Sequence, residues 1–190
     1  MNHSHIPKKR SKIWMAFWIN IAFFLVELIG GLYTNSLALL ADAGHMLTDV
    51  FALGLVIFTS SLAKRPRDSI NSFGYLRINI IGAFINGALL VFICAYIIIE
   101  TITRINITYT IKGFELFIIA IFGLIANGIS ALIIKNEIND SINMKGAFLH
   151  LLMDGLGSVS AIISGIIIWN WGWYQIDLIS SIIIVILILY

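Results

Sequence analysis

The sequence predicts an all-α membrane protein with six transmembrane helices. Of its 190 residues, 59% are hydrophobic and only 12% are charged, whereas soluble domains carry about 25% charged residues. The apolar residues fall into six long segments, and most of the charged residues lie in the short stretches between them. The net charge of +2 is too small to indicate nucleic-acid binding. The single cysteine, Cys94, lies in an apolar run, so it excludes an internal disulfide and any site built from several thiolates.

A helix needs about 20 mostly apolar residues to cross a bilayer. The first apolar segment follows a basic stretch, residues 1–12, and has no small-residue cleavage site, so we interpret it as a retained span. The sixth segment rises only roughly 22 Å, against roughly 30 Å of hydrocarbon. We therefore expect that the sixth span is truncated and that no C-terminal cytoplasmic domain follows the transmembrane domain, residues 13–190. The predicted spans are 13–33, 37–63, 78–99, 114–134, 146–169 and 176–190.

Lysine and arginine are distributed unevenly between the two sides of this topology. Ten of them fall on the side of the N-terminus and two, Arg104 and Lys112, on the other. The positive-inside rule then places the N-terminus in the cytoplasm. Trp169, Trp171 and Trp173 cluster at the outer end of the fifth span, as an interfacial aromatic belt would. The first and last three spans have opposite topology, so a 3+3 inverted repeat is an open interpretation.

The second and fifth spans carry the same pair of polar residues. His45 and Asp49 stand four residues apart, and so do His150 and Asp154, which places each pair on one face of a helix. Two imidazoles and two carboxylates form a ligand set for Zn²⁺. Because these ligands bind protons when the metal leaves, the set also suits metal/proton exchange. Whether the pairs meet stays open, since their mean depths differ by about 10 Å when each is counted from its own helix end.

The alternative for each pair is a local contact that satisfies two buried polar groups. Glu27 in the first span and Asp42, three residues before His45, are candidates for a supporting role or a proton relay. A paired structural carboxylate is the alternative for both. Asp177, at the outer end of the sixth span, is interpreted as an interfacial residue.

Three stretches resemble the cation diffusion facilitator family, and the similarity covers nearly the whole chain. They are residues 36–49, 73–77 and 146–154. The resemblance implies six transmembrane helices, a homodimer, and exchange of cytoplasmic Zn²⁺ for protons by alternating access. It places His45, Asp49, His150 and Asp154 on the family's transport site. The sequence departs from the family pattern at Leu76, Asn79 and Leu178, and in lacking the usual C-terminal metal-binding domain.

We therefore expect an exporter of Zn²⁺ or a related divalent cation, without a prosthetic group, in the cytoplasmic membrane of a bacterium. One alternative is a truncated remnant that binds metal or a partner without transport. Another is an intramembrane zinc enzyme, which would need Glu27 or Asp42 as a general base and an open coordination position. No His-Glu-x-x-His motif supports the enzyme.

Overall fold

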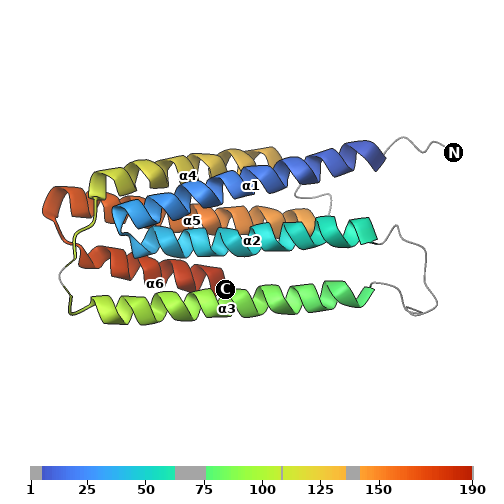
Figure 1. Ribbon diagram of the computed structural model, residues 1–190. Coiled ribbons are helices and arrows are strands. Elements are labelled where there is room, and N and C mark those ends of the chain that lie inside the picture. The colour runs from blue at the N-terminus through green and yellow to red at the C-terminus, as the bar shows by residue number, and fades with distance from the viewer. Residues whose placement is uncertain (1–5, 63–75, 108, 136–141, 190) are drawn as a thin grey trace.

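A computed structural model describes residues 6–62, 76–107, 109–135 and 142–189 (Figure 1). These residues form six helices, as predicted, and no helix boundary differs from its predicted span by more than seven residues. Helix α1 begins at Ile6, so the basic residues of segment 1–12 already belong to its first turns. The helices are α1 (Ile6–Thr34), α2 (Leu37–Leu62), α3 (Leu76–Arg104), α4 (Gly113–Lys135), α5 (Ile142–Trp171) and α6 (Gln175–Leu189).

The helix ends follow from local chemistry. Asn35 ends α1 with a φ of 61°, a left-handed conformation that asparagine tolerates better than most residues. Ser36 then caps α2, since its Oγ accepts a hydrogen bond from the backbone N–H of Leu39 at 3.2 Å. Gly172 ends α5 with a φ of 65°, and its N–H bonds to the carbonyl of Ile168 at 2.9 Å. Tight turns at these points make α1 and α2, and α5 and α6, antiparallel neighbours.

The outer surface of the bundle is apolar. Large side chains such as Phe84 and Phe92 on α3 are more than two-thirds exposed, which fits contact with acyl chains. Five helices, α1 to α5, are long and apolar enough to cross a membrane, and α6 is a shorter apolar helix of 15 residues. Within the described residues, the chain is thus a multi-pass helical membrane protein with five candidate spans.

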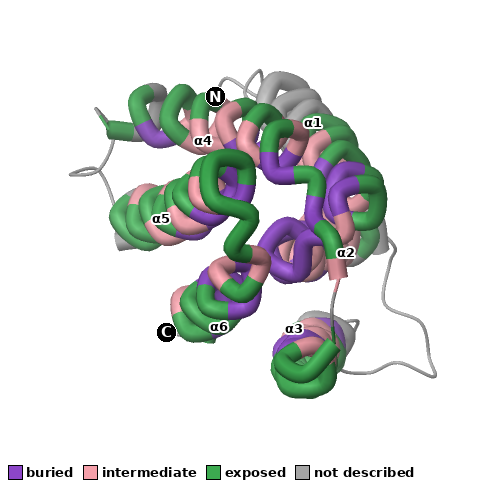
Figure 2. Tube along the Cα trace, turned by 90° about the vertical axis from the view of Figure 1, so that its left-hand side faces the viewer, coloured by how far each residue is buried: buried purple, intermediate pink, exposed green. Residues whose placement is uncertain are grey.

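The helices pack with their buried faces inward, and α3 lies at the edge of the bundle next to α2 and α6 (Figure 2). Helices α4 and α5 form the most extensive pair. They can approach closely because glycines face each other: a Cβ on Gly165 would lie 3.0 Å from the carbonyl oxygen of Gly113. Cys94 is buried in the core with Leu37, Ala41 and Ile184, as expected for a small apolar residue.

One end of the bundle, which we call the tryptophan end, carries Trp169, Trp171 and Trp173. Asp177 lies at this end, where the sequence placed it, and its side chain is fully buried within the protein. Its carboxylate accepts hydrogen bonds from Ser36 Oγ at 2.5 Å and from the N–H of Leu37 at 2.6 Å. The free N–H groups at the start of α2 therefore stabilise this charge and draw it away from the lipid.

Candidate metal site

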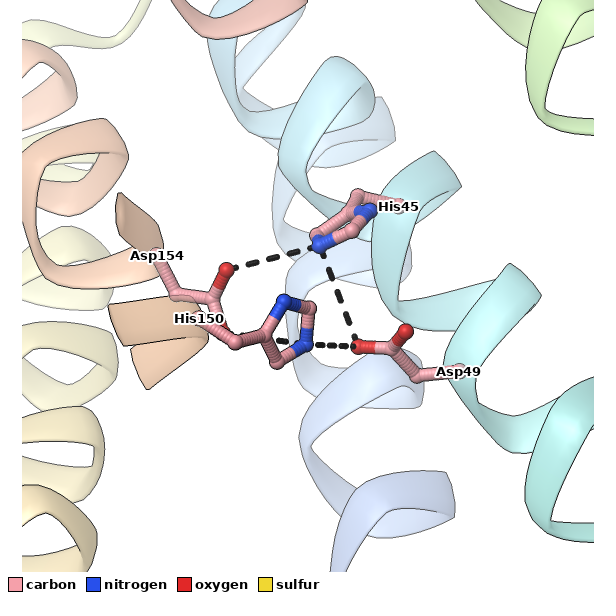
Figure 3. Close-up of side chains that lie close together, drawn as sticks. All are labelled: His45, Asp49, His150 and Asp154. Atoms are coloured by element: carbon pink, nitrogen blue, oxygen red, sulfur yellow. Dashed lines mark hydrogen bonds and ion pairs between the residues drawn. The ribbon is translucent and has the colours of Figure 1, made fainter. Parts of the chain in front are cut away.

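The candidate site lies between α2 and α5, about two to three turns inward from the start of α2. On each helix the histidine and the aspartate are four residues apart, which puts them on one face. The two helices run in opposite directions and turn these faces toward each other, so His45, Asp49, His150 and Asp154 converge on a common centre (Figure 3). We call these four residues the quartet.

The contacts within the quartet cross from helix to helix. His150 Nε2 lies 3.1 Å from Asp49 Oδ2, and His45 Nε2 lies 3.4 Å from Asp154 Oδ1. Contacts within each helix are longer, 3.9 Å between His45 Nε2 and Asp49 Oδ2 and 3.7 Å between His150 Nε2 and Asp154 Oδ2. One ligand atom from each residue lies within 4.8 Å of the others. A tetrahedral Zn²⁺ with bonds of about 2.0–2.1 Å holds its ligand atoms roughly 3.3 Å apart, so ligand atoms that lie up to 4.8 Å apart would have to close by up to roughly 1.5 Å to reach that geometry.

The two His/Asp pairs meet although their depths, counted from the helix ends, differ by about 10 Å. They meet because α5 extends farther than α2 at the tryptophan end (Figure 1). Asp154 is much farther from the end of α5, at Trp171, than His45 is from the start of α2, at Leu37. Figure 1 shows why the residues still meet: α5 extends past the start of α2 at the tryptophan end. Levels counted from helix ends were therefore misleading, because the ends themselves are not level.

Three residues of the quartet, His45, His150 and Asp154, line a cavity of about 420 Å³ between α2, α5 and α6. The His45 and Asp154 side chains are 12% and 16% exposed, whereas the His150 side chain is 44% exposed. The two carboxylates carry a combined charge that a divalent cation would balance, and two neutral imidazoles add nitrogen ligands without charge. His45 Nδ1 is buried without a hydrogen-bond partner among the described residues. The arrangement can therefore hold one divalent cation inside the bundle.

The two supporting candidates occupy different places. Asp42 is buried and lines the cavity beside the quartet. Glu27 is buried at Gly123 of α4. Neither carboxylate makes a hydrogen bond to a quartet residue among the described parts of the chain. The structure thus brings the quartet together and leaves Glu27 and Asp42 outside its immediate contacts.

Sequence reasoning did not foresee the burial of Asp177, and it gave no role to the buried Ser158. One sequence signal pointed to half of the contact between Asp177 and the start of α2: Ser36 stands directly before an apolar helix, the position of a typical N-cap. Nothing in the sequence indicated that the partner of this cap comes from a helix about 140 residues later. Ser158 gave no signal, because serines are common in transmembrane helices.

Comparison with known proteins provides an independent line of evidence. The cation efflux transmembrane domain family matches residues 13–190. A "Cadmium, cobalt and zinc/H(+)-K(+) antiporter" of Bacillus subtilis (strain 168) is 39% identical over 192 residues, which cover 100% of this chain and 62% of the relative.

Two further relatives carry related names. The zinc transporter ZitB of Pectobacterium atrosepticum is 42% identical over 99% of this chain and 59% of the relative. The metal cation efflux system protein CzcD of Cupriavidus metallidurans is 38% identical over 93% of this chain and 56% of the relative. The chain spans about three-fifths of the length of these relatives.

Proposed function

Since the chain belongs to the cation efflux family, we propose that it moves a divalent cation, preferably Zn²⁺, out of the cytoplasm in exchange for protons. The observation that carries this proposal is the quartet, two nitrogen and two oxygen ligands within 4.8 Å of one another between two transmembrane helices. The relatives are named as transporters and antiporters of zinc, cadmium and cobalt, which supports a transport role rather than a hydrolytic one.

We propose that His45, Asp49, His150 and Asp154 bind the transported cation directly. Each helix contributes one histidine and one aspartate, so separating α2 from α5 would divide the ligand set in half. Alternating access follows from this arrangement: a rocking motion between the helices opens the site first to one side and then to the other. Four ligands fill a tetrahedral shell and leave no position for a catalytic water, which disfavours the zinc enzyme.

Protons are the proposed counter-ion because they compete for the same atoms. Histidine nitrogens and carboxylate oxygens bind metal only when they are deprotonated, so a rise in proton concentration lowers the affinity for the metal. With the N-terminus in the cytoplasm, the tryptophan end faces outward. Protons entering from that side would displace the cation there and return the carrier to its inward-facing form.

The proposal also covers the membrane placement and the oligomeric state of the protein. We propose that residues 13–190 form the transmembrane domain, with α6 as its sixth span, in a bacterial cytoplasmic membrane. We also propose a homodimer, as in the family that the sequence resembles. The exposed apolar face of α3 is available to a second copy as well as to lipid.

The test is metal flux in proteoliposomes with an imposed pH gradient. Wild type should transport Zn²⁺ in the direction opposite to that in which protons flow down their gradient. The variants Asp49→Ala and Asp154→Ala should not transport Zn²⁺. Met153→Leu is the control, since it changes a cavity-lining residue between two ligands at nearly constant volume. Flux in both aspartate variants equal to wild type would remove the proposed site. Zn²⁺ binding without flux in wild type would instead favour the non-transporting remnant.

A further inference from the structure

A carboxylate outside the quartet lies deep between α1, α4 and α5. Glu27 is 4% exposed, and its Oε2 has no hydrogen-bond partner among the described residues. Its Oε1 lies 3.1 Å from the position that a Cβ on Gly123 would take. Ser158 Oγ, on α5, lies 3.3 Å from the same position and is likewise buried without a partner. Two polar side chains from different helices thus converge on one glycine, each with an unsatisfied oxygen.

A charged Glu27 would be costly at this place. Burying an ionised carboxylate without a partner costs several kcal/mol even after the protein relaxes. No lysine or arginine among the described residues forms an ion pair with it. The carboxyl group must therefore carry a proton or face a bound cation.

A proton fits the surroundings of Glu27 better than a metal ion. Zn²⁺ usually takes four nitrogen, oxygen or sulfur ligands, whereas one carboxylate and one hydroxyl meet here. Among the described residues, the quartet is the one cluster of three or more candidate metal ligands, and Glu27 is not part of it. A proton requires the carboxyl group alone, and Ser158 can hydrogen-bond to it directly or through water.

The position of Ser158 on α5 links Glu27 to the quartet. Ser158 meets Glu27 at Gly123 and stands four residues after Asp154, so the side chains of Asp154 and Ser158 share one face of α5, one turn apart. Asp42 of α2 lies beside the neighbouring Gly157, and α4 presents Gly123, which carries no charge. The negative charges of Asp154 and Asp42 therefore disfavour a further negative charge on Glu27 when the quartet is free of metal. A divalent cation between the quartet residues would cancel the charge of Asp154 and weaken that repulsion.

The segment of α5 beside Glu27 also reaches the cavity. Gly157 precedes Ser158 on α5, and a Cβ there would lie 3.7 Å from Asp42 Oδ1. Gly157 and Asp42 both line the cavity beside the quartet. Ser158, which meets Glu27 at Gly123, is therefore the chain neighbour of a residue that lines the cavity.

We propose that Glu27 is a second proton-binding site, which holds a proton in the metal-free protein and releases it when a divalent cation occupies the quartet. In this step the O–H bond of Glu27 breaks, the carboxylate keeps the electron pair, and the proton passes by water to the cavity. The inference rests on the proposed function, because it takes the quartet as the metal site.

Infrared spectroscopy of the metal-free protein in liposomes at neutral pH tests the proton directly. A protonated carboxyl group gives a C=O stretching band that an ionised one lacks. We expect this band to be weaker in Glu27→Gln, unchanged in Glu115→Gln, a carboxylate on α4 away from the cluster, and restored in Glu27→Asp. In wild type, which needs no variant to fold, addition of ZnCl₂ should reduce the band. Equal bands in wild type and Glu27→Gln, or no change on adding Zn²⁺, would overturn the proposal.

Counting protons separates this inference from the proposed function. A pH-sensitive dye in weak buffer reports the protons released for each Zn²⁺ bound, and we expect about one fewer in Glu27→Gln than in wild type or Glu115→Gln. If wild type binds no Zn²⁺, the proposed function fails. If wild type and Glu27→Gln bind Zn²⁺ and release equal numbers of protons, the function stands and the role of Glu27 is refuted.

Discussion

Ser36, which caps α2, donates a hydrogen bond to the fully buried carboxylate of Asp177 in the first turn of α6. The second carboxylate oxygen accepts the N–H of Leu37, so one side chain from α6 binds two donors at the start of α2. Nearby, Arg104 at the end of α3 donates to the backbone carbonyl and side-chain oxygen of Asn35, each at 3.1 Å. These contacts hold the start of α2, the end of α3 and the start of α6 together at the tryptophan end. The two ligands of α2, His45 and Asp49, lie farther along the helix.

The first prediction concerns this tie. Asp177→Ala should destabilise the protein by about 2–3 kcal/mol, because it leaves the Ser36 hydroxyl and the Leu37 N–H buried without their charged acceptor. Thermal unfolding in detergent measures the change. Asn170→Ala, which removes an exposed amide at the same end of the bundle, should have little effect.

A second variant at this position, Asp177→Asn, separates a structural from a metal-binding role for Asp177. Its carboxylate is engaged by α2, so the Zn²⁺ affinity of folded Asp177→Asn, measured by calorimetry, should remain close to that of wild type. A loss of affinity as large as that caused by changing a quartet residue would show that Asp177 acts at the metal instead.

How far the sequence predicts this structure depends on how far apart the interacting residues lie along the chain. The six helices follow from local composition, and the identity of the quartet follows from the repeated four-residue spacing on two spans. The cross-pairing of His45 with Asp154 could not be derived, because it depends on how far α5 extends past α2. The burial of Asp177 has the same origin: it requires the packing of α6 against α2, which no local pattern encodes.

The second prediction is that metal binding stabilises the fold through the quartet. A ligand that binds only the folded protein raises its stability by RT ln(1 + [L]/Kd), about 2.7 kcal/mol at a concentration of 100 Kd. Added Zn²⁺ should therefore raise the unfolding temperature of wild type, and a chelator should reverse the shift. His45→Ala and His150→Ala should each reduce the shift markedly, and Met153→Leu should retain it. An undiminished shift in the double histidine variant would mean that Zn²⁺ binds elsewhere.

The third prediction is a pH effect outside the membrane-spanning helices, at Tyr109 in the connection between α3 and α4. Burial, the largest cause, and the negative charge of Asp177 together raise the pKa of Tyr109 to about 12, against the opposing effect of the Arg104 charge. Because the pKa is higher in the folded than in the unfolded protein, this group stabilises the fold below its ordinary pKa of about 10. That contribution is lost as the pH rises from about 10 through about 12.

Ultraviolet difference spectra can follow this titration as the phenolate forms. The component that disappears in Tyr109→Phe should titrate near pH 12 in wild type. In Asp177→Asn the pKa of Tyr109 should fall, since one cause of its rise has been removed. A Tyr109 component that titrates near pH 10, like a free tyrosine, would contradict the half-buried position of the ring beside Asp177.

The fourth prediction concerns the glycine contact that lets α4 and α5 approach. A Cβ on Gly165 would lie 2.8 Å from the backbone nitrogen of Phe117 and 2.9 Å from its Cα. These are backbone atoms that cannot turn aside, so Gly165→Ala must push the helices apart, at a cost of about 1–3 kcal/mol. Gly87→Ala is the matched control, because a Cβ there has no neighbour within 4 Å and alanine favours a helix. Thermal unfolding should therefore show Gly165→Ala clearly less stable than Gly87→Ala. Equal stability of the two variants would mean that α4 and α5 are not in backbone contact at this point.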